Sequence, residues 1–154
     1  MQTLDHLIRS HPFWRGLDSR HFHLLNEYAA LVKFGANEPI FHAGIEAEFF
    51  YLIYAGRVSL ETFVPGQGAV TIETLASGQA LGWSWLFSPY RWHFSAHSIE
   101  LTEAVAFSAH GLRNYAEKNH DFGYELTRRV SEVILQRLQA TRLNLVEFYA
   151  SPTG

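Results

Sequence analysis

The sequence predicts an α+β fold that is mainly β, in which a closed antiparallel sheet is flanked by helices at both ends. Apolar residues follow a helical spacing near the N-terminus, alternate with polar residues in the middle of the chain, and return to helical spacing near the C-terminus. We therefore expect N-terminal helices over residues 3–33, a β-barrel over residues 34–108 and C-terminal helices over residues 110–149.

The N-terminal helical pattern consists of large residues that recur at steps of three and four: Leu17, His21, Leu24, Leu25 and Tyr28. Asp18 or Ser19 is available to cap the helix, while Pro12 and Gly16 interrupt the stretch before it. These helices are expected to cover one end of the barrel.

The middle of the chain reads as a series of short strands. In residues 49–63, successive side chains are expected to point to opposite faces of a sheet, with a turn at Gly56. Residues 65–68 are expected to form the tip of a hairpin, followed by a return strand at residues 70–73. Closely spaced strands with glycine-rich turns favour an antiparallel sandwich or barrel over a parallel sheet.

The composition indicates one soluble domain over residues 1–154. The chain is 47% hydrophobic, which is enough for one buried core at this length. A net charge of −3 with only 18% charged residues gives no general attraction to nucleic acid or to an anionic membrane. The N-terminus lacks the layout of a secretory signal, no apolar run could span a membrane, and there is no cysteine, so we expect a cytoplasmic location.

The C-terminal part predicts a short helix over residues 111–119 and a long helix over residues 122–149. The long helix carries a seam with spacings of four and three: Ile134, Leu138, Thr141, Leu145 and Phe148. This seam either packs on the barrel of the same chain or pairs with a partner. Because a helix of about 40 Å overruns a small barrel, we expect a homodimer through this helix.

The stretch from Gly78 to Ser98 concentrates the functional signals, since it holds three of the four tryptophans. Gly82 allows a sharp turn into a short helix whose first amides would face an anion. Pro89 ends that helix, and Arg91 and His93 then return along a strand beside the same opening.

This stretch resembles the phosphate-binding cassette of the cyclic-nucleotide-binding domain family, of catabolite-activator, Fnr-like and kinase regulatory-subunit type. The cassette would be residues 82–87 followed by 91–96. The resemblance extends from about His11 to Tyr149 and implies a double-stranded β-helix, or jelly-roll barrel. The cassette is degenerate, because the family's ribose-binding glutamate falls on Trp83 and its phosphate-binding arginine falls on Trp92 or His93.

The resemblance implies a small-molecule-sensing regulatory module whose ligand lies between the cassette and the long helix. Nine residues are the candidate ligand contacts: Gly82, Trp83, Ser84, Trp85, Arg91, His93, Ser95, Thr141 and Arg142. Ligand occupancy would bias the docking of the helix. Regulators of the family place a helix-turn-helix domain after this helix, and only residues 150–154 follow it here, so no direct contact with nucleic acid is expected.

Three interpretations of the pocket remain at this stage. It binds a cyclic nucleotide, it binds another small ligand, or tryptophans fill it and the chain is a ligand-free interaction or scaffold domain that docks a protein partner. An empty polar cavity beside Gly82 would favour sensing, and Trp83 or Trp92 inside it would favour a scaffold.

No enzyme motif is present, so we expect a binding module rather than an enzyme. The nine histidines are dispersed along the sequence and predict no metal site. Ligation of a haem iron by one histidine is an alternative that the sequence leaves open. A barrel metal site would need His42, His93 and His97 to converge. A cyclic nucleotide is the one cofactor candidate that the family suggests.

Overall fold

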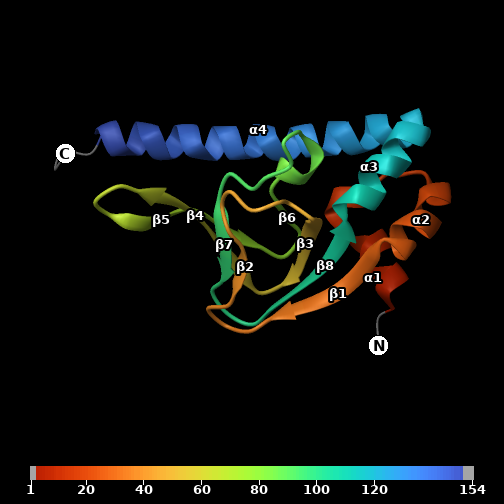
Figure 1. The fold of residues 1–154 in the computed structure, drawn as a ribbon, viewed down its shortest axis with the longest axis horizontal. Helices are drawn as coiled ribbons and strands as arrows, with labels where there is room; N and C mark the ends of the chain where they lie inside the picture. Colours follow the sequence, from red (N-terminus) through yellow and green to blue (C-terminus); the bar gives the residue numbers. More distant parts are fainter. Residues whose placement is uncertain (1–2, 151–154) are drawn as a thin grey trace.

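The computed structural model describes residues 3–150, so residues 1–2 and 151–154 of the predicted single domain lie outside it. Antiparallel strands form two four-stranded sheets that share one hydrophobic core (Figure 1). The strand orders are β1-β8-β3-β6 and β2-β7-β4-β5. This is the jelly-roll architecture with a long C-terminal helix that the sequence predicts, so the expected fold class is confirmed.

The first sheet contains β1 (Ala29–Phe34), β8 (Thr102–Ser108), β3 (Phe49–Ala55) and β6 (Ala80–Leu81). The second sheet contains β2 (Pro39–Phe41), β7 (Ser95–Ser98), β4 (Arg57–Val64) and β5 (Gly68–Ala76). The predicted hairpin tip does join β4 to β5, where Gln67 N donates to Val64 O at 2.9 Å. Side chains such as Phe50, Leu75 and Phe107 are fully buried between the sheets.

The N-terminal segment is less helical than expected. It contains α1 (Leu4–Ser10), the 3-10 turns η1 (Pro12–Trp14) and η2 (Ser19–His21), and α2 (Phe22–Glu27). The predicted helical span to residue 33 is wrong, because β1 begins at Ala29. Every residue of β1 pairs with β8, from Ala29 opposite Phe107 to Phe34 opposite Thr102. Long-range strand pairing thus overrides the local helical spacing.

Both C-terminal helices are present, as α3 (Ala109–Lys118) and α4 (His120–Ala150). The Ser108 side chain caps α3 by accepting from Gly111 N at 3.1 Å. Helix α4 lies along the barrel and continues beyond it beside the β4–β5 hairpin (Figure 1), where Asn144 Nδ2 donates to Ile72 O at 3.3 Å. Among the described residues, no helix has the length and apolarity to cross a membrane.

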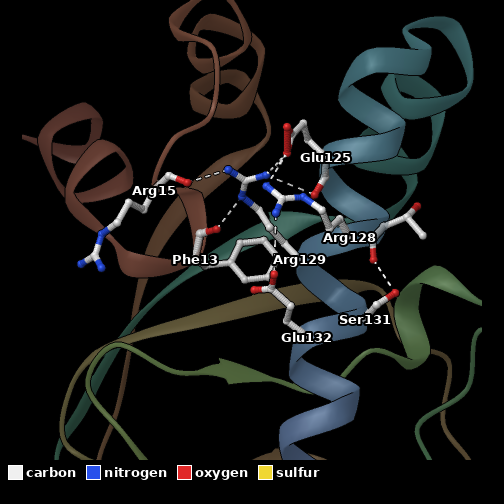
Figure 2. A network of polar contacts seen from close by, with 8 residues as sticks. Phe13, Arg15, Glu125, Arg128, Arg129, Ser131 and Glu132 are labelled. Atoms are coloured by element: carbon white, nitrogen blue, oxygen red, sulfur yellow. Dashed lines mark hydrogen bonds and ion pairs between the residues drawn. The ribbon is translucent and has the colours of Figure 1, made fainter.

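A buried arginine fixes α4 to the N-terminal turns. Figure 2 shows the Arg129 guanidinium reaching two backbone carbonyls, of Phe13 at 2.8 Å and Arg15 at 2.6 Å, as well as Glu125 on its own helix. Trp14 also stacks on Phe122 of α4, with 6.2 Å between ring centroids. Together these contacts set the rotation of α4 and therefore the face that it presents to the barrel.

Candidate functional site

The turn after β6 has the conformation that the sequence predicts. Gly82 has a φ of 71°, a left-handed conformation that favours glycine, and a Cβ at this position would lie 3.0 Å from Trp92 Cζ3. The short helix that follows is a single 3-10 turn, η3 (Ser84–Leu86). Glycine is therefore needed here both for the turn and for the close approach of an indole.

That indole fills the space beside the turn. Trp92 is only 5% exposed and stacks on Phe41 of β2, with 3.8 Å between ring centroids and 8° between ring planes. A cavity of about 10 Å³ remains. Its wall is formed by Phe41, Leu60, Gly82, Trp83, Ser84, Trp92, Phe94 and Arg137. The residual space holds at most about one water molecule.

Four of the predicted contact residues lie around this cavity or its rim. Gly82, Trp83 and Ser84 line it. His93 does not line it but contacts its wall, since the ring Nδ1 of His93 lies 3.0 Å from Ser84 Oγ in a hydrogen bond. The cassette therefore brings these four residues together around one small cavity.

Arg91 and Ser95 contact a different segment. Arg91 Nη1 donates to Gly44 O at 2.9 Å from an exposed position, and Ser95 Oγ accepts from Ala43 N at 3.0 Å. Neither residue lines the cavity beside Gly82. In this conformation Arg91, the cation that the sequence offers for a phosphate, fastens the loop before β3 instead.

The two cassette tryptophans outside the stack have different environments. Trp85 is fully buried in the barrel core and stacks on Phe50, with 4.6 Å between ring centroids. Trp83 is half-buried, and the guanidinium carbon of Arg137 lies 5.6 Å from its ring centroid. Trp83 is thus the link between the cassette and α4.

On α4 the cavity is lined by Arg137 rather than by the predicted Thr141 and Arg142, which are both exposed. The sequence contained a signal for this. Arg137 follows Leu126 and Val130 at steps of four and seven, so it continues the stripe that faces the barrel. A charged residue in a buried stripe is the pattern that would have identified it.

Arg137 is incompletely paired for a buried cation. Its Nε lies 3.0 Å from Glu73 Oε2 of β5, and its Nη2 makes only a long bond of 3.4 Å to Ala80 O. Among the described residues, no acceptor reaches the buried Nη1 atom, and Glu73 Oε2 lacks a well-aligned donor. Burial lowers the pKa of Arg137 below its usual value, and the charge of Glu73 opposes this shift.

Two of the three histidines proposed for a barrel metal site, His93 and His97, make other contacts. The ring Nδ1 of His97 lies 2.6 Å from Glu61 Oε1, and His93 is bonded to Ser84. Within residues 3–150, no group of three histidine, aspartate or glutamate side chains is placed to hold a metal ion.

A family model described as "Cyclic nucleotide-binding domain" matches residues 31–119, which includes the whole cassette. The chain belongs to the cyclic nucleotide-binding domain family. The family that the cassette resembles is thereby confirmed.

Solved structures of this family have the same fold. A putative cyclic nucleotide-binding protein from Geobacter metallireducens GS-15 has a TM-score of 0.78 at 23% identity, over 89% of this chain and 99% of that one. The sensor domain of the transcriptional regulator DNR from Pseudomonas aeruginosa has a TM-score of 0.69 at 18% identity, over 86% and 89%. No curated protein matches the chain.

The catabolite activator protein of Thermus thermophilus is similar at a TM-score of 0.70 and 22% identity, over 90% of this chain. The match covers 63% of that regulator. At these identities the likeness concerns the fold of this cyclic nucleotide-binding domain. What its own pocket can hold depends on Trp92, Phe41 and Arg137.

Proposed function

We propose that this chain is a regulatory module of the cyclic nucleotide-binding family that has replaced the nucleotide with its own aromatic side chains and acts through α4. The stack of Trp92 on Phe41 carries this proposal, because it occupies the space beside the cassette turn. Of the interpretations left open by the sequence, the filled pocket favours an interaction module over a cyclic nucleotide sensor.

The size of the remaining space supports the absence of nucleotide binding. Pockets for small molecules of nucleotide size measure roughly 300 Å³ or more, whereas the cavity beside Gly82 measures about 10 Å³. A cyclic phosphate would also need a cation near the cassette, and Arg91 is bonded to Gly44 O. The space beside Gly82 and the cation that the sequence offers for a phosphate, Arg91, are therefore both engaged in other contacts.

Titration with cyclic AMP and cyclic GMP, followed by isothermal calorimetry and tryptophan fluorescence, tests this part. We expect no saturable heat or fluorescence change at millimolar nucleotide. Saturable binding in the micromolar range would refute the proposal that protein side chains replace the ligand.

The surface through which the module acts on a partner is the distal half of α4. Large apolar side chains there are more than half exposed: Leu135, Leu138, Leu143, Leu145, Val146, Phe148 and Tyr149. Its 31 residues span about 46 Å at 1.5 Å per residue, and its distal part extends beyond the barrel. An apolar surface of this extent is typical of an interface, and a homodimer through α4 is the simplest partner.

Sedimentation equilibrium of the intact chain tests the homodimer. We expect a dimer that Leu138→Glu together with Leu145→Glu converts to a monomer, because buried carboxylates would face each other across the interface. Thr127→Glu adds a charge at an exposed position in the proximal half of the same helix, outside the apolar surface, and is the matched control. A wild-type chain that stays monomeric at high micromolar concentration would contradict this part.

A further inference from the structure

An open cavity lies outside the cassette turn, where the loop after η3 meets helices α3 and α4. It has a volume of about 500 Å³ and shares no lining residue with the remnant beside Gly82. Its wall is mainly apolar and includes Leu86 of η3, Tyr90 of the loop, Ala116 of α3 and Tyr124 of α4. Sites for small molecules measure roughly 300–1,000 Å³, so this cavity has the volume that the remnant lacks.

Tyr90 is held in a backbone conformation that is uncommon for a residue with a side chain. Its φ is 59°, in the left-handed region. Two backbone bonds fix it, because Tyr90 N donates to Phe87 O at 2.8 Å and Ala47 N donates to Tyr90 O at 2.6 Å. The ring lies against Arg113 of α3, whose guanidinium carbon is 4.0 Å from the ring centroid. A strained residue that places an aromatic ring at a cavity is typical of a binding site.

Arg113 has two donors that the described part of the chain does not use. Its Nη1 donates to Trp85 O at 2.5 Å, and this bond and the contact with Tyr90 fix the guanidinium at the cavity wall. Among residues 3–150, no carboxylate forms an ion pair with Arg113, and no acceptor reaches its Nε or Nη2. Unlike Nη1 of Arg137, these two nitrogens are not buried, so solvent reaches them.

Glu117 brings the opposite charge to the same cavity. It is exposed, lies four positions after Arg113 on α3 and also lines the cavity. Side chains at this spacing are neighbours on one face of a helix. The two form no ion pair within residues 3–150, because the guanidinium contacts Tyr90 and Trp85 O instead. The cavity therefore offers a neighbouring cation and anion, together with an apolar wall.

We propose that this cavity binds a free apolar α-amino acid, whose carboxylate pairs with Arg113 and whose ammonium pairs with Glu117. The two charges of an α-amino acid are joined through one carbon, so they match a cation and an anion that are neighbours on one helix face. The apolar wall receives the side chain of the ligand, and its two tyrosines favour an aromatic one. The inference goes beyond the proposed function, because this site is separate from the cavity that Trp92 fills.

Isothermal calorimetry with L-phenylalanine and three truncated analogues tests each contact. The analogue 3-phenylpropionate lacks the ammonium, phenethylamine lacks the carboxylate, and glycine lacks the apolar side chain. We expect saturable binding of L-phenylalanine, with an affinity about tenfold or more above that of each analogue. The Arg113 Nε–H signal of the ¹⁵N-labelled chain should also move on binding. The absence of saturable binding at millimolar L-phenylalanine, or equal affinity for any one analogue, would overturn the inference.

Two variants assign the two charges of the ligand to their partners. Glu117→Gln should remove the advantage of L-phenylalanine over 3-phenylpropionate and keep its advantage over phenethylamine. Arg113→Met should remove the advantage over phenethylamine and keep the other. Lys118→Met changes an exposed position of the same helix outside the cavity, so it should keep both advantages.

A further variant distinguishes this cavity from a neighbouring one. Arg113 also borders a more polar cavity of about 390 Å³ that is lined by Glu46 and Glu48. Glu48→Gln should leave the affinity for L-phenylalanine unchanged. If it weakens binding and Glu117→Gln does not, the ligand occupies the polar cavity and the inference is wrong. Both glutamates are exposed, so these two variants remain decisive even if Arg113→Met, which loses the bond to Trp85 O, does not fold.

Discussion

The indole of Trp92 lies parallel to the ring of Phe41 at a centroid distance of 3.8 Å, between the cassette turn and β2. Gly82 is part of the same contact, since its backbone approaches the edge of the indole. Through Trp83 the cassette also touches Arg137, and through Arg137 it touches Glu73 of β5. The filled pocket and the long helix are therefore one packed unit.

Trp92→Ala should reduce the free energy of unfolding by about 3–5 kcal/mol, because removal of a buried indole leaves a cavity beside Phe41. Urea denaturation followed by far-ultraviolet circular dichroism measures the loss. Phe87→Ala in the same loop is the control, since Phe87 is 46% exposed and its removal should cost about 1 kcal/mol or less. Similar losses for the two variants would show that Trp92 is not packed as described.

Gly82→Ala should destabilise the fold through two effects, the left-handed backbone conformation and the contact of the new methyl group with the indole edge. Gly66→Ala isolates the first effect, because Gly66 has a φ of 86° and nothing within 4 Å of its Cβ position. We expect about 1–2 kcal/mol for Gly66→Ala and a clearly larger loss for Gly82→Ala in the same denaturation assay. A smaller loss at Gly82 would mean that the indole lies elsewhere.

Arg129→Met should destabilise the chain by about 2–4 kcal/mol, because it removes the buried guanidinium that donates to the carbonyl oxygens of Phe13 and Arg15. The adjacent Arg128 is 49% exposed and pairs with Glu125 and Glu132 on its own helix (Figure 2). Arg128→Met should therefore change stability by about 0.5 kcal/mol or less. Chemical denaturation distinguishes the two, and equal effects would contradict the network that docks α4.

Stability should rise with pH between about pH 4 and pH 6.5 because of His11. Burial lowers the pKa of this histidine from 6.5 to about 4, and the hydrogen bond between its ring and Ile53 O opposes the shift. Within that range the unfolded chain binds a proton that the folded chain does not, so acid favours unfolding. His11 should account for about 3 kcal/mol lost between pH 6.5 and pH 4, with its full contribution present above pH 6.5.

Denaturation curves at several pH values, compared between the wild type and His11→Gln, isolate this contribution from that of the carboxylates. The variant should show a shallower dependence on pH in this range. His23→Gln is the control, because His23 is 83% exposed. A wild type and His11→Gln with parallel pH dependence would show that the pKa of His11 is the same in the folded and unfolded chains, against this account.

The sequence predicts the order of elements well where local signals are strong. The glycine turn at 82, the hairpin tip at 65–68 and the long C-terminal helix each depend on residues that are informative by themselves. It fails at residues 29–33, where an Ala-Ala-Leu-Val run is shaped by pairing with β8 more than 70 residues later. Pairing between strands that are distant in sequence cannot be recognised from the spacing of apolar residues within one short segment.

The site is only partly predictable for the same kind of reason. Residues 82–84 form the cavity wall as expected, but the direction of Trp92 and Arg91 is decided by Phe41 and Gly44, which come from an earlier part of the chain. Arg137 replaces Thr141 and Arg142 at the wall because Arg129 and Trp14 set the rotation of α4. Side-chain direction and helix rotation are tertiary properties, whereas the glycine turn is a local one.

A crystal structure of the chain grown with saturating cyclic AMP tests the central claim most directly. The account predicts Trp92 stacked on Phe41 beside Gly82, with no nucleotide between the cassette and α4. Electron density for a cyclic nucleotide beside Gly82, with the Trp92 indole turned out into solvent, would contradict it.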